Sequence, residues 1–195
     1  INKKKKWITN NLSRIRTHLI RSNYDSVLST STSINKDNSL LNCRLNGFDK
    51  TKPDLIIIDF NLKIKPNLKL FNSPKKRKIF IVTSILKGEK ITYLKKRGIK
   101  FLNITSLDTK NDFIKLFVKL KKKGFNRILV ETGLKFLNKL LINKLVYNLY
   151  TFRSSLRIGK NGLNNGTIKI IKKFKIFKKN ISNLNEDKLH MVKIK

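Results

Sequence analysis

The sequence predicts an α/β protein built on a mainly parallel β-sheet flanked by helices. The first observation is a continuous apolar run, "DLIIID", which is typical of a strand buried on both faces of a sheet. The second is the alternation of such runs with segments of helical periodicity, the pattern of right-handed β-α-β crossovers. The third is the strand-rich final third of the chain, which predicts an antiparallel addition near the C-terminus.

The elements of the first half follow from local patterns. Apolar residues recur at helical spacing up to Ser22, and either Asn10 or Asn11 suits the N-cap of that helix. The stretch "DSVLSTSTS" predicts a short strand that runs into a hydroxyl-rich turn, and "INKDNSLLNCRLNG" predicts a long ordered loop. The strand "PDLIIIDFN" then ends in Asp59, and "KIFIVTS" repeats its pattern.

In the second half, "ITYLKKRG" predicts a short helix and "IKFLNI" a strand. The segment "NDFIKLFVKLKKKG" predicts a helix with one apolar stripe, and Gly124 is its natural stop. A short strand, 128–130, ends in Glu131, and Gly133 opens the next helix. The segments "VYNLYTFRSSL" and "KLHMVKIK" predict strands, with the connection "GKNGLNNG" between them.

Length and composition bound the class of protein. The 195 residues suit one domain, 1–195, and 39% hydrophobic content suffices for a core. A single cysteine and two histidines argue against both an internal disulfide and a metal site. Neither a membrane span nor a secretion signal is visible, which favours a cytoplasmic protein. The chain opens on Ile1 without the look of a natural start, so we expect a fragment of a longer protein.

The formal net charge of +35 admits two interpretations. Clustered lysines can neutralise phosphates of a nucleic acid and release their counterions. The lysines here occur in almost every segment and come with many Asn and Ile residues, which share A/T-rich codons. A compositional drift would give the same charge with no selection for binding. We therefore favour a solvated lysine coat and regard a nucleic-acid partner as unlikely.

Polar residues at the carboxyl ends of the predicted strands mark the expected site. Ligands of open α/β sheets bind there, and the rule selects 29–33, 59–60, 83–84 and 131–133. Gly133 lets a ligand approach the start of a helix, and Glu131 can accept hydrogen bonds from it. The same two residues also suit a tight turn and an acid near a helix N-terminus, so both interpretations stay open.

Several spaced segments together resemble the reductase domain of the bifunctional riboflavin-biosynthesis deaminase/reductase family. They are "KWITN", Arg21, the hydroxyl-rich turn with "INKDNSLLNCR", "PDLIIID", "RILVETG" and "RSSLRIG", in the order of that family. The resemblance covers nearly the whole chain. It implies a dihydrofolate-reductase-like fold, NADPH as cofactor, and reduction of the ribosyl group of 5-amino-6-(5-phosphoribosylamino)uracil to the ribityl form. It also implies a homodimer, with a first strand and a deaminase domain upstream of residue 1.

The resemblance assigns individual residues to two groups. The substrate-binding residues would be Arg21, Leu41, Arg44 and Glu131, and the cofactor-binding residues would be Trp7, Ser33, Asp37 and Gly133. Two guanidinium groups suit a phosphate, because they bind it bidentately. No catalytic acid is assigned. Alone, each residue also has a structural interpretation, such as a helix-end cation for Arg21 or an Asx-turn for Asp37.

The sequence departs from the family pattern mainly on the cofactor side. Phe60 stands where serine is common, Lys135 where threonine is preferred, and Thr132 and Leu134 flank the glycine in place of Gly/Ala and Pro. Two alternatives therefore remain. One is a decayed or repurposed paralogue that acts as a basic nucleic-acid-associated protein. The other is a reductase for a related pyrimidine or pterin substrate, since a fold does not fix the substrate.

Overall fold

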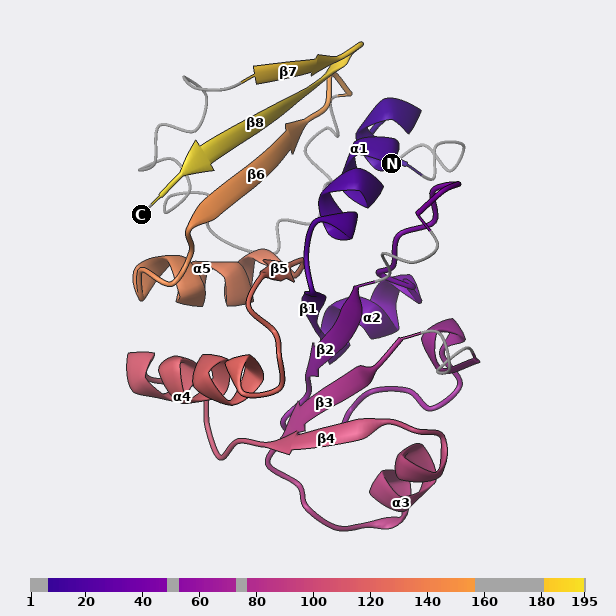
Figure 1. The fold of residues 1–195 in the computed structure, drawn as a ribbon, viewed down its shortest axis with the longest axis vertical. Helices are drawn as coiled ribbons and strands as arrows, with labels where there is room; N and C mark the ends of the chain where they lie inside the picture. The colour runs from indigo at the N-terminus through magenta and orange to yellow at the C-terminus, as the bar shows by residue number, and fades with distance from the viewer. Residues whose placement is uncertain (1–6, 49–52, 73–76, 157–180, 195) are drawn as a thin grey trace. The chain divides into compact units, whose positions relative to one another are not determined.

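The computed structural model describes residues 7–48, 53–72, 77–156 and 181–194 (Figure 1). In chain order, its elements are α1 (Asn11–Ser22), β1 (Ser26–Thr30), α2 (Ser31–Asp37), β2 (Asp54–Ile58), the 3-10 helix η1 (Lys69–Asn72), β3 (Ile79–Thr83), α3 (Glu89–Lys96), β4 (Lys100–Asn103), α4 (Lys110–Lys121), β5 (Ile128–Val130), α5 (Leu134–Ile142), β6 (Asn148–Arg153), β7 (Ile181–Leu184) and β8 (Asp187–Lys193). The chain divides into two compact units. The larger comprises residues 18–132, and the smaller comprises residues 1–17 and 133–195.

The larger unit contains a five-stranded parallel sheet in the order β4-β3-β2-β1-β5. The strand β1 pairs with β2 on one side and with β5 on the other, so that Leu28 lies opposite both Ile56 and Val130. Apolar β-branched residues fill β2 and β3, and almost all of their side chains are buried, as expected of strands covered on both faces. The predicted fold class, a mainly parallel sheet flanked by helices with additional antiparallel strands, is confirmed.

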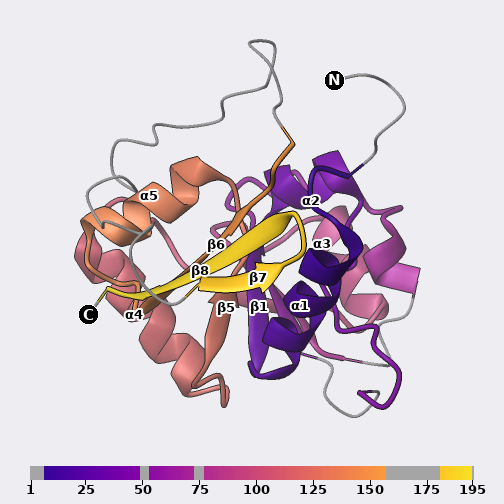
Figure 2. The ribbon, with the colours of Figure 1, turned by 90° about the horizontal axis from the view of Figure 1, so that it is seen from above.

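Helices cover both faces of this sheet. Seen from above, α2 and α3 lie on one side of the strands and α4 on the other (Figure 2). Because side chains alternate along a strand, Leu55 and Ile57 of β2 join the core on the first side, together with Ile34 of α2. On the other side, Phe80 of β3 packs edge-to-face against Phe125, with 5.3 Å between ring centroids.

The helix α2 corrects one expectation. Residues 31–37 were predicted as a hydroxyl-rich turn and the start of a loop, but they form a helix. The Thr30 hydroxyl accepts a hydrogen bond from the Ser33 N–H and so caps the helix. The side chain of Ile34 is fully buried and anchors the helix on the sheet. Asn38 ends it in the left-handed conformation, with φ of 45°.

The helix α4 shows how the sequence specifies local structure. Thr109 and Asp112 form a reciprocal capping box at its start. The predicted stripe faces the core, with Phe113, Leu116 and Leu120 fully buried. The predicted stop is confirmed, since Gly124 follows the helix with φ of 92°, a value that favours glycine.

The smaller unit contains a three-stranded antiparallel sheet in the order β6-β8-β7. The strands β6 and β8 were predicted, whereas β7 was not, and the connection "GKNGLNNG" lies outside the described residues. Of the two candidate caps of α1, Asn10 is the one used, because its side-chain oxygen accepts from the Ser13 N–H at 2.9 Å. The buried Asp187 accepts from the Asn10 N–H and the Ser13 hydroxyl.

Several acidic side chains accept hydrogen bonds from main-chain N–H groups. Asp25 accepts from the N–H groups of two residues that precede β5, at 2.8 and 2.7 Å. Asp54 accepts from the Lys78 N–H at 2.7 Å. Asp59, Asp112 and Asp187 likewise accept hydrogen bonds from main-chain N–H groups. In a chain with 11 acidic residues, much of the negative charge is therefore committed to the fold itself.

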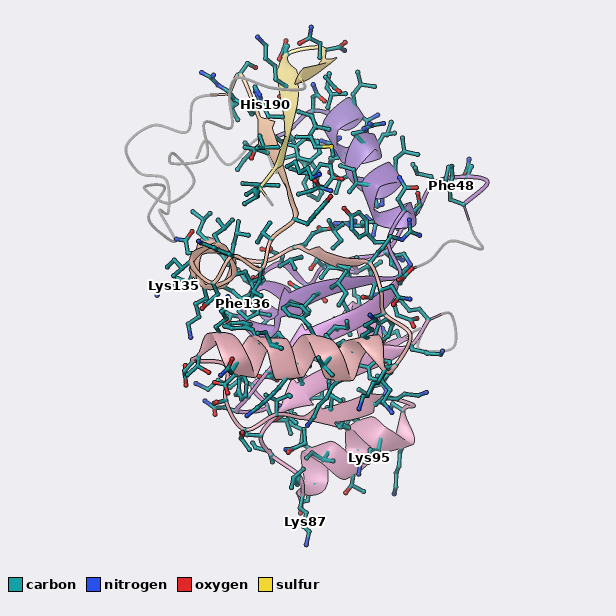
Figure 3. The ribbon with its side chains drawn as sticks, turned by 60° about the vertical axis from the view of Figure 1, so that its left-hand side comes forward. Phe48, Lys87, Lys95, Lys135, Phe136 and His190 are labelled. Carbon is teal, nitrogen blue, oxygen red and sulfur yellow. The ribbon has the colours of Figure 1, made fainter. Side chains whose placement is uncertain are left out.

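Lysine side chains dominate the exposed surface. Lys87 and Lys95, near the two ends of α3, point outward into solvent (Figure 3). Among the described residues, no helix is long and apolar enough to cross a membrane. The same residues contain no group of three or more His, Cys, Asp or Glu side chains that could hold a metal ion.

Candidate functional site

The site begins where β5 ends. The Glu131 N–H donates to the carbonyl of Leu28 at 2.9 Å, which continues the pairing of β5 with β1 by one residue. This bond fixes the backbone of Glu131 at the carboxyl end of the parallel strands, where α/β sheets place their ligands. The Glu131 carboxylate is partly buried, with 24% of the side chain exposed. A carboxylate in such a position needs a partner.

That partner is Arg21, at the C-terminal end of α1. Its Nε donates to Oε1 of Glu131 at 2.6 Å, and its Nη2 donates to Oε2 at 2.7 Å. The pair is therefore bidentate, and 12% of the Arg21 side chain is exposed. Bidentate geometry fixes the plane of the guanidinium, which a lysine could not reproduce. The fold thus brings together two candidate site residues that lie 110 positions apart.

Asn42 contacts one histidine and two arginine side chains through two oxygen atoms. Its main-chain carbonyl accepts from Nη1 of Arg21 at 3.1 Å and lies 3.0 Å from Nδ1 of His18. Its side-chain Oδ1 accepts from Nη1 of Arg44 at 2.8 Å. Arg44 itself is exposed. The second candidate arginine is therefore linked to the first through one asparagine.

Positive charge exceeds negative charge in this cluster. Partial burial, and then the nearby Arg21 and Arg44, lower the pKa of the His18 imidazole below its usual 6.5. Partial burial and Arg21 also lower the pKa of Arg44. Burial is the larger cause of both shifts, and repulsion from the nearby guanidiniums is the second. An anion bound here would relieve that repulsion.

Leu41 belongs to the hydrophobic core. Its side chain is 8% exposed and packs in the cluster that contains Val27 and Ile34. Its backbone is left-handed, with φ of 50°, an unusual conformation for leucine. Arg77 donates to the carbonyls of Leu40 and Leu41. Burial lowers the pKa of Arg77 to about 10, opposed by Asp54. Leu41 therefore fixes the loop that carries Asn42 and Arg44.

A second strand-end carboxylate, Asp59, is used differently. It is 4% exposed and accepts from the Ser31 hydroxyl and from the N–H groups of Lys63 and Ile64, at 2.8 to 2.9 Å. After the same strand, the Phe60 carbonyl accepts from the Thr83 hydroxyl. These groups hold the loops after β2 and β3 in place.

Two candidate cofactor residues of the larger unit lie on α2. The Ser33 hydroxyl lies 3.1 Å from Oγ1 of Thr30 and takes part in the cap of the helix. Asp37 is exposed at the C-terminal end of the helix. The hydrogen bonds of Arg21 and Glu131 described above involve neither of these residues.

The other two candidate cofactor residues belong to the smaller unit. Trp7 is 58% exposed, and the Arg14 guanidinium lies over its ring, 5.4 Å from the centroid. Gly133 is the N-cap of α5 and has no side chain to cap the helix. Its φ of −68° is ordinary extended backbone, so no positive φ demands glycine here. Lys135 stands exposed in the first turn of α5 (Figure 3).

Sequence reasoning missed Asn42 and His18. Asparagine is common in loops, and one of the two Asn42 acceptors is a main-chain carbonyl, which residue identity does not reveal. His18 could have been found, because it lies three residues before Arg21 and therefore on the same face of α1.

The parallel sheet, its helices and the small antiparallel sheet define an α/β protein of the dihydrofolate-reductase-like class. The family model of the RibD C-terminal domain matches residues 1–175. The chain belongs to this family.

Known proteins agree with this assignment. The riboflavin biosynthesis protein RibD of Aquifex aeolicus (strain VF5) is 29% identical over 185 residues, which cover 93% of this chain and 50% of that protein. The chain thus spans about half the length of this curated relative. Solved structures share the fold. RibD of Acinetobacter baumannii superposes with a TM-score of 0.75 at 17% identity, over 99% of this chain and 53% of that one. The riboflavin biosynthesis reductase of Saccharomyces cerevisiae gives 0.68 at 20% identity, over 94% and 81%.

Proposed function

We propose that residues 1–195 act as one reductase domain of riboflavin biosynthesis. The reaction would reduce the ribosyl group of 5-amino-6-(5-phosphoribosylamino)uracil to the ribityl form with NADPH. The observation that carries the proposal is the bidentate pair of Arg21 and Glu131, linked to Arg44 through Asn42 in a chain of this family. The relative from Thermotoga maritima is described as a deaminase and 5-amino-6-(5-phosphoribosylamino)uracil reductase.

The two arginines suit the phosphate of that substrate. Arg44 is exposed and donates to Asn42 through Nη1, so the rest of its guanidinium can reach a phosphate oxygen. Arg21 is held in place by Glu131 and contributes charge and its remaining N–H hydrogens. Together they would bind a dianion that is also favoured by the crowding of cations in the cluster.

Glu131 suits the pyrimidine. A carboxylate offers about four acceptor positions, and Arg21 uses one on each oxygen. The remaining lone pairs can accept from ring or amino N–H groups of the substrate. Glu131 would therefore have two roles. It would bind the pyrimidine directly, and it would orient Arg21 toward the phosphate.

The candidate cofactor residues fit a dinucleotide phosphate in part. At Gly133 no side chain caps α5 within the described residues, and Lys135 adds positive charge in the first turn. The free N–H groups in the first turn of a helix stabilise a phosphate bound there. Ser33 and Asp37 would bind hydroxyl groups of the cofactor, and Trp7 would pack against it. When bound, NADPH supplies the hydride, and the protein's task is to position the imine-like carbon of the ring-opened substrate.

The proposal is tested by turnover. Incubation with the deaminated pyrimidine substrate and NADPH should consume NADPH at a rate that depends on both. The Glu131→Gln variant keeps the shape of the side chain and should lose most of the rate of the unmodified protein. Absence of turnover together with absence of NADPH binding would contradict the proposal. Turnover of a pterin or another pyrimidine in preference would keep the reductase and change its substrate. Light scattering tests the homodimer that the family suggests.

The net charge supports a second candidate, a basic protein associated with nucleic acid. Saturable binding of single-stranded or duplex nucleic acid, with an affinity that falls steeply with salt, would favour it. Weak and non-saturable adsorption would instead fit the lysine coat.

A further inference from the structure

Asn42 connects an imidazole and two guanidinium groups that come from different parts of the chain. His18 and Arg21 belong to α1, and Arg44 belongs to the loop that follows α2. The main-chain carbonyl of Asn42 contacts His18 and Arg21, and its side-chain oxygen accepts from Arg44. One residue therefore links the two guanidiniums.

The position of Asn42 is set by contacts of its own loop. Leu41 anchors the preceding residue in the core, and Arg77 holds the carbonyls of Leu40 and Leu41. With these two carbonyls engaged by Arg77, the carbonyl of Asn42 is the one that accepts from α1. The position of Asn42 is thus set by contacts that do not involve the proposed ligand.

Arg44 needs such support more than Arg21 does. Arg21 is largely buried and held by a bidentate partner, whereas Arg44 is exposed. A free arginine side chain has many rotamers, and ordering them on binding costs affinity. Repulsion from Arg21 would also push Arg44 away. The hydrogen bond from Arg44 to Oδ1 of Asn42 opposes both effects.

We propose that Asn42 is a positioning residue for phosphate recognition, which holds Arg44 next to Arg21 so that both guanidiniums meet one phosphate group. The inference rests on the proposed function, because it takes a sugar phosphate as the ligand. It adds a specificity-determining residue: the Asn42 side chain acts on the phosphate end of the substrate and leaves the other end alone.

Binding of ribose 5-phosphate, measured by calorimetric titration, tests this without catalysis. The Asn42→Ala variant keeps the main-chain carbonyl and frees only Arg44, so its Kd should rise roughly five- to tenfold. The Kd for NADPH and the urea midpoint should not change. The control is Asn126→Ala, which removes an exposed asparagine side chain of the same unit and should leave all three values unchanged. An unchanged Kd for ribose 5-phosphate in Asn42→Ala would overturn the inference.

The Asn42→Asp variant separates positioning from a structural role. It is nearly isosteric and keeps an acceptor for Arg44, so a structural role predicts binding close to that of the unmodified protein. If Asn42 positions Arg44 for an anion, the new carboxylate competes with the phosphate, and the Kd should rise more than in Asn42→Ala. A Kd equal to that of the unmodified protein would overturn the inference, and this comparison remains possible even if Asn42→Ala fails to fold.

Failure of the proposed function would look different. A protein whose affinity for ribose 5-phosphate depends on Asn42, but which does not oxidise NADPH, would retain the inference and lose the reductase. A protein that reduces the substrate with equal KM in all Asn42 variants would retain the reductase and lose the inference. Absence of any ribose 5-phosphate binding by the unmodified protein would also overturn it.

Discussion

Asp59 and Glu131 both follow parallel strands of the same sheet, yet the protein uses them in different ways. Asp59 is almost fully buried and accepts from one hydroxyl and two main-chain N–H groups. Glu131 is partly exposed and binds one side chain, Arg21. The first carboxylate is occupied by the loop that it organises, whereas the second retains acceptor positions for a ligand.

The difference teaches that a polar residue at a strand end is only a candidate. The number and kind of donors that the protein itself supplies decide whether the residue serves the fold or a ligand. The two residues should therefore respond in opposite ways to mutation, one mainly in stability and the other mainly in activity.

The largest effect is expected for Asp59→Ala. Removing the carboxylate leaves the Ser31 hydroxyl and the N–H groups of Lys63 and Ile64 without their acceptor, and the first and last of these are buried. The free energy of unfolding, measured in urea, should fall by about 3–5 kcal/mol. Asp37→Ala, which removes an exposed carboxylate, is the matched control and should change it by less than about 0.5 kcal/mol. Similar losses in both variants would remove the distinction.

Glu131→Gln should cost less stability and more activity. The amide keeps the shape of the side chain but loses its charge, and one of its two ends now donates toward Arg21. We expect kcat/KM to fall about 100-fold, equivalent to about 2.7 kcal/mol, and stability to fall by about 1 kcal/mol. In Asp59→Asn, by contrast, the folded fraction should keep its kcat/KM. Equal losses of stability and activity in Glu131→Gln would indicate a structural ion pair.

Arg44→Ala should mainly raise the KM for the phosphorylated substrate. Because Arg44 is exposed, its removal should change stability little, and the KM for the phosphorylated substrate should rise about tenfold. Arg44→Lys keeps the charge but not the planar guanidinium, so its KM should lie between the values of the unmodified protein and of Arg44→Ala. A comparison of phosphorylated and dephosphorylated substrates checks the assignment, since a KM increase for both would place Arg44 away from the phosphate.

The smallest effect is expected from pH. The pKa of folded His18 lies below its usual 6.5, so between these two values the unfolded chain binds more protons than the folded protein. Stability should therefore fall as pH drops through 6.5 and level off below the folded pKa. The effect is small, because solvent screens the charges around a partly exposed imidazole. His18→Gln should lack this component in urea titrations at several pH values; an identical pH dependence would exclude it.

Most of the fold could be predicted from the sequence. The strand β2 and the helix α4 carry strong patterns, since one is uniformly apolar and the other has a stripe of large side chains. The helix α2 was missed, because "STSINKD" contains residues that also favour turns. What makes it helical is the cap at Thr30 and the burial of Ile34, and burial depends on the rest of the fold.

The site was predictable as a set of residues and not as a set of contacts. Family resemblance selected Arg21 and Glu131, but their mutual hydrogen bonds depend on how β5 pairs with β1. Leu41 was selected as a substrate residue, and its side chain lies in the core. Its contact with a substrate remains a prediction, as do the roles of the other selected residues.

The commitment of acidic side chains to main-chain N–H groups has a consequence for protein engineering. Exposed lysines such as Lys87 and Lys95 could be exchanged for glutamate or glutamine to bring the net charge toward neutrality at little cost. Asp25, Asp59 and Asp187 could not be exchanged in return, since each holds two or more donors in place. The positive charge of this surface is thus open to redesign, whereas these three carboxylates are part of the framework.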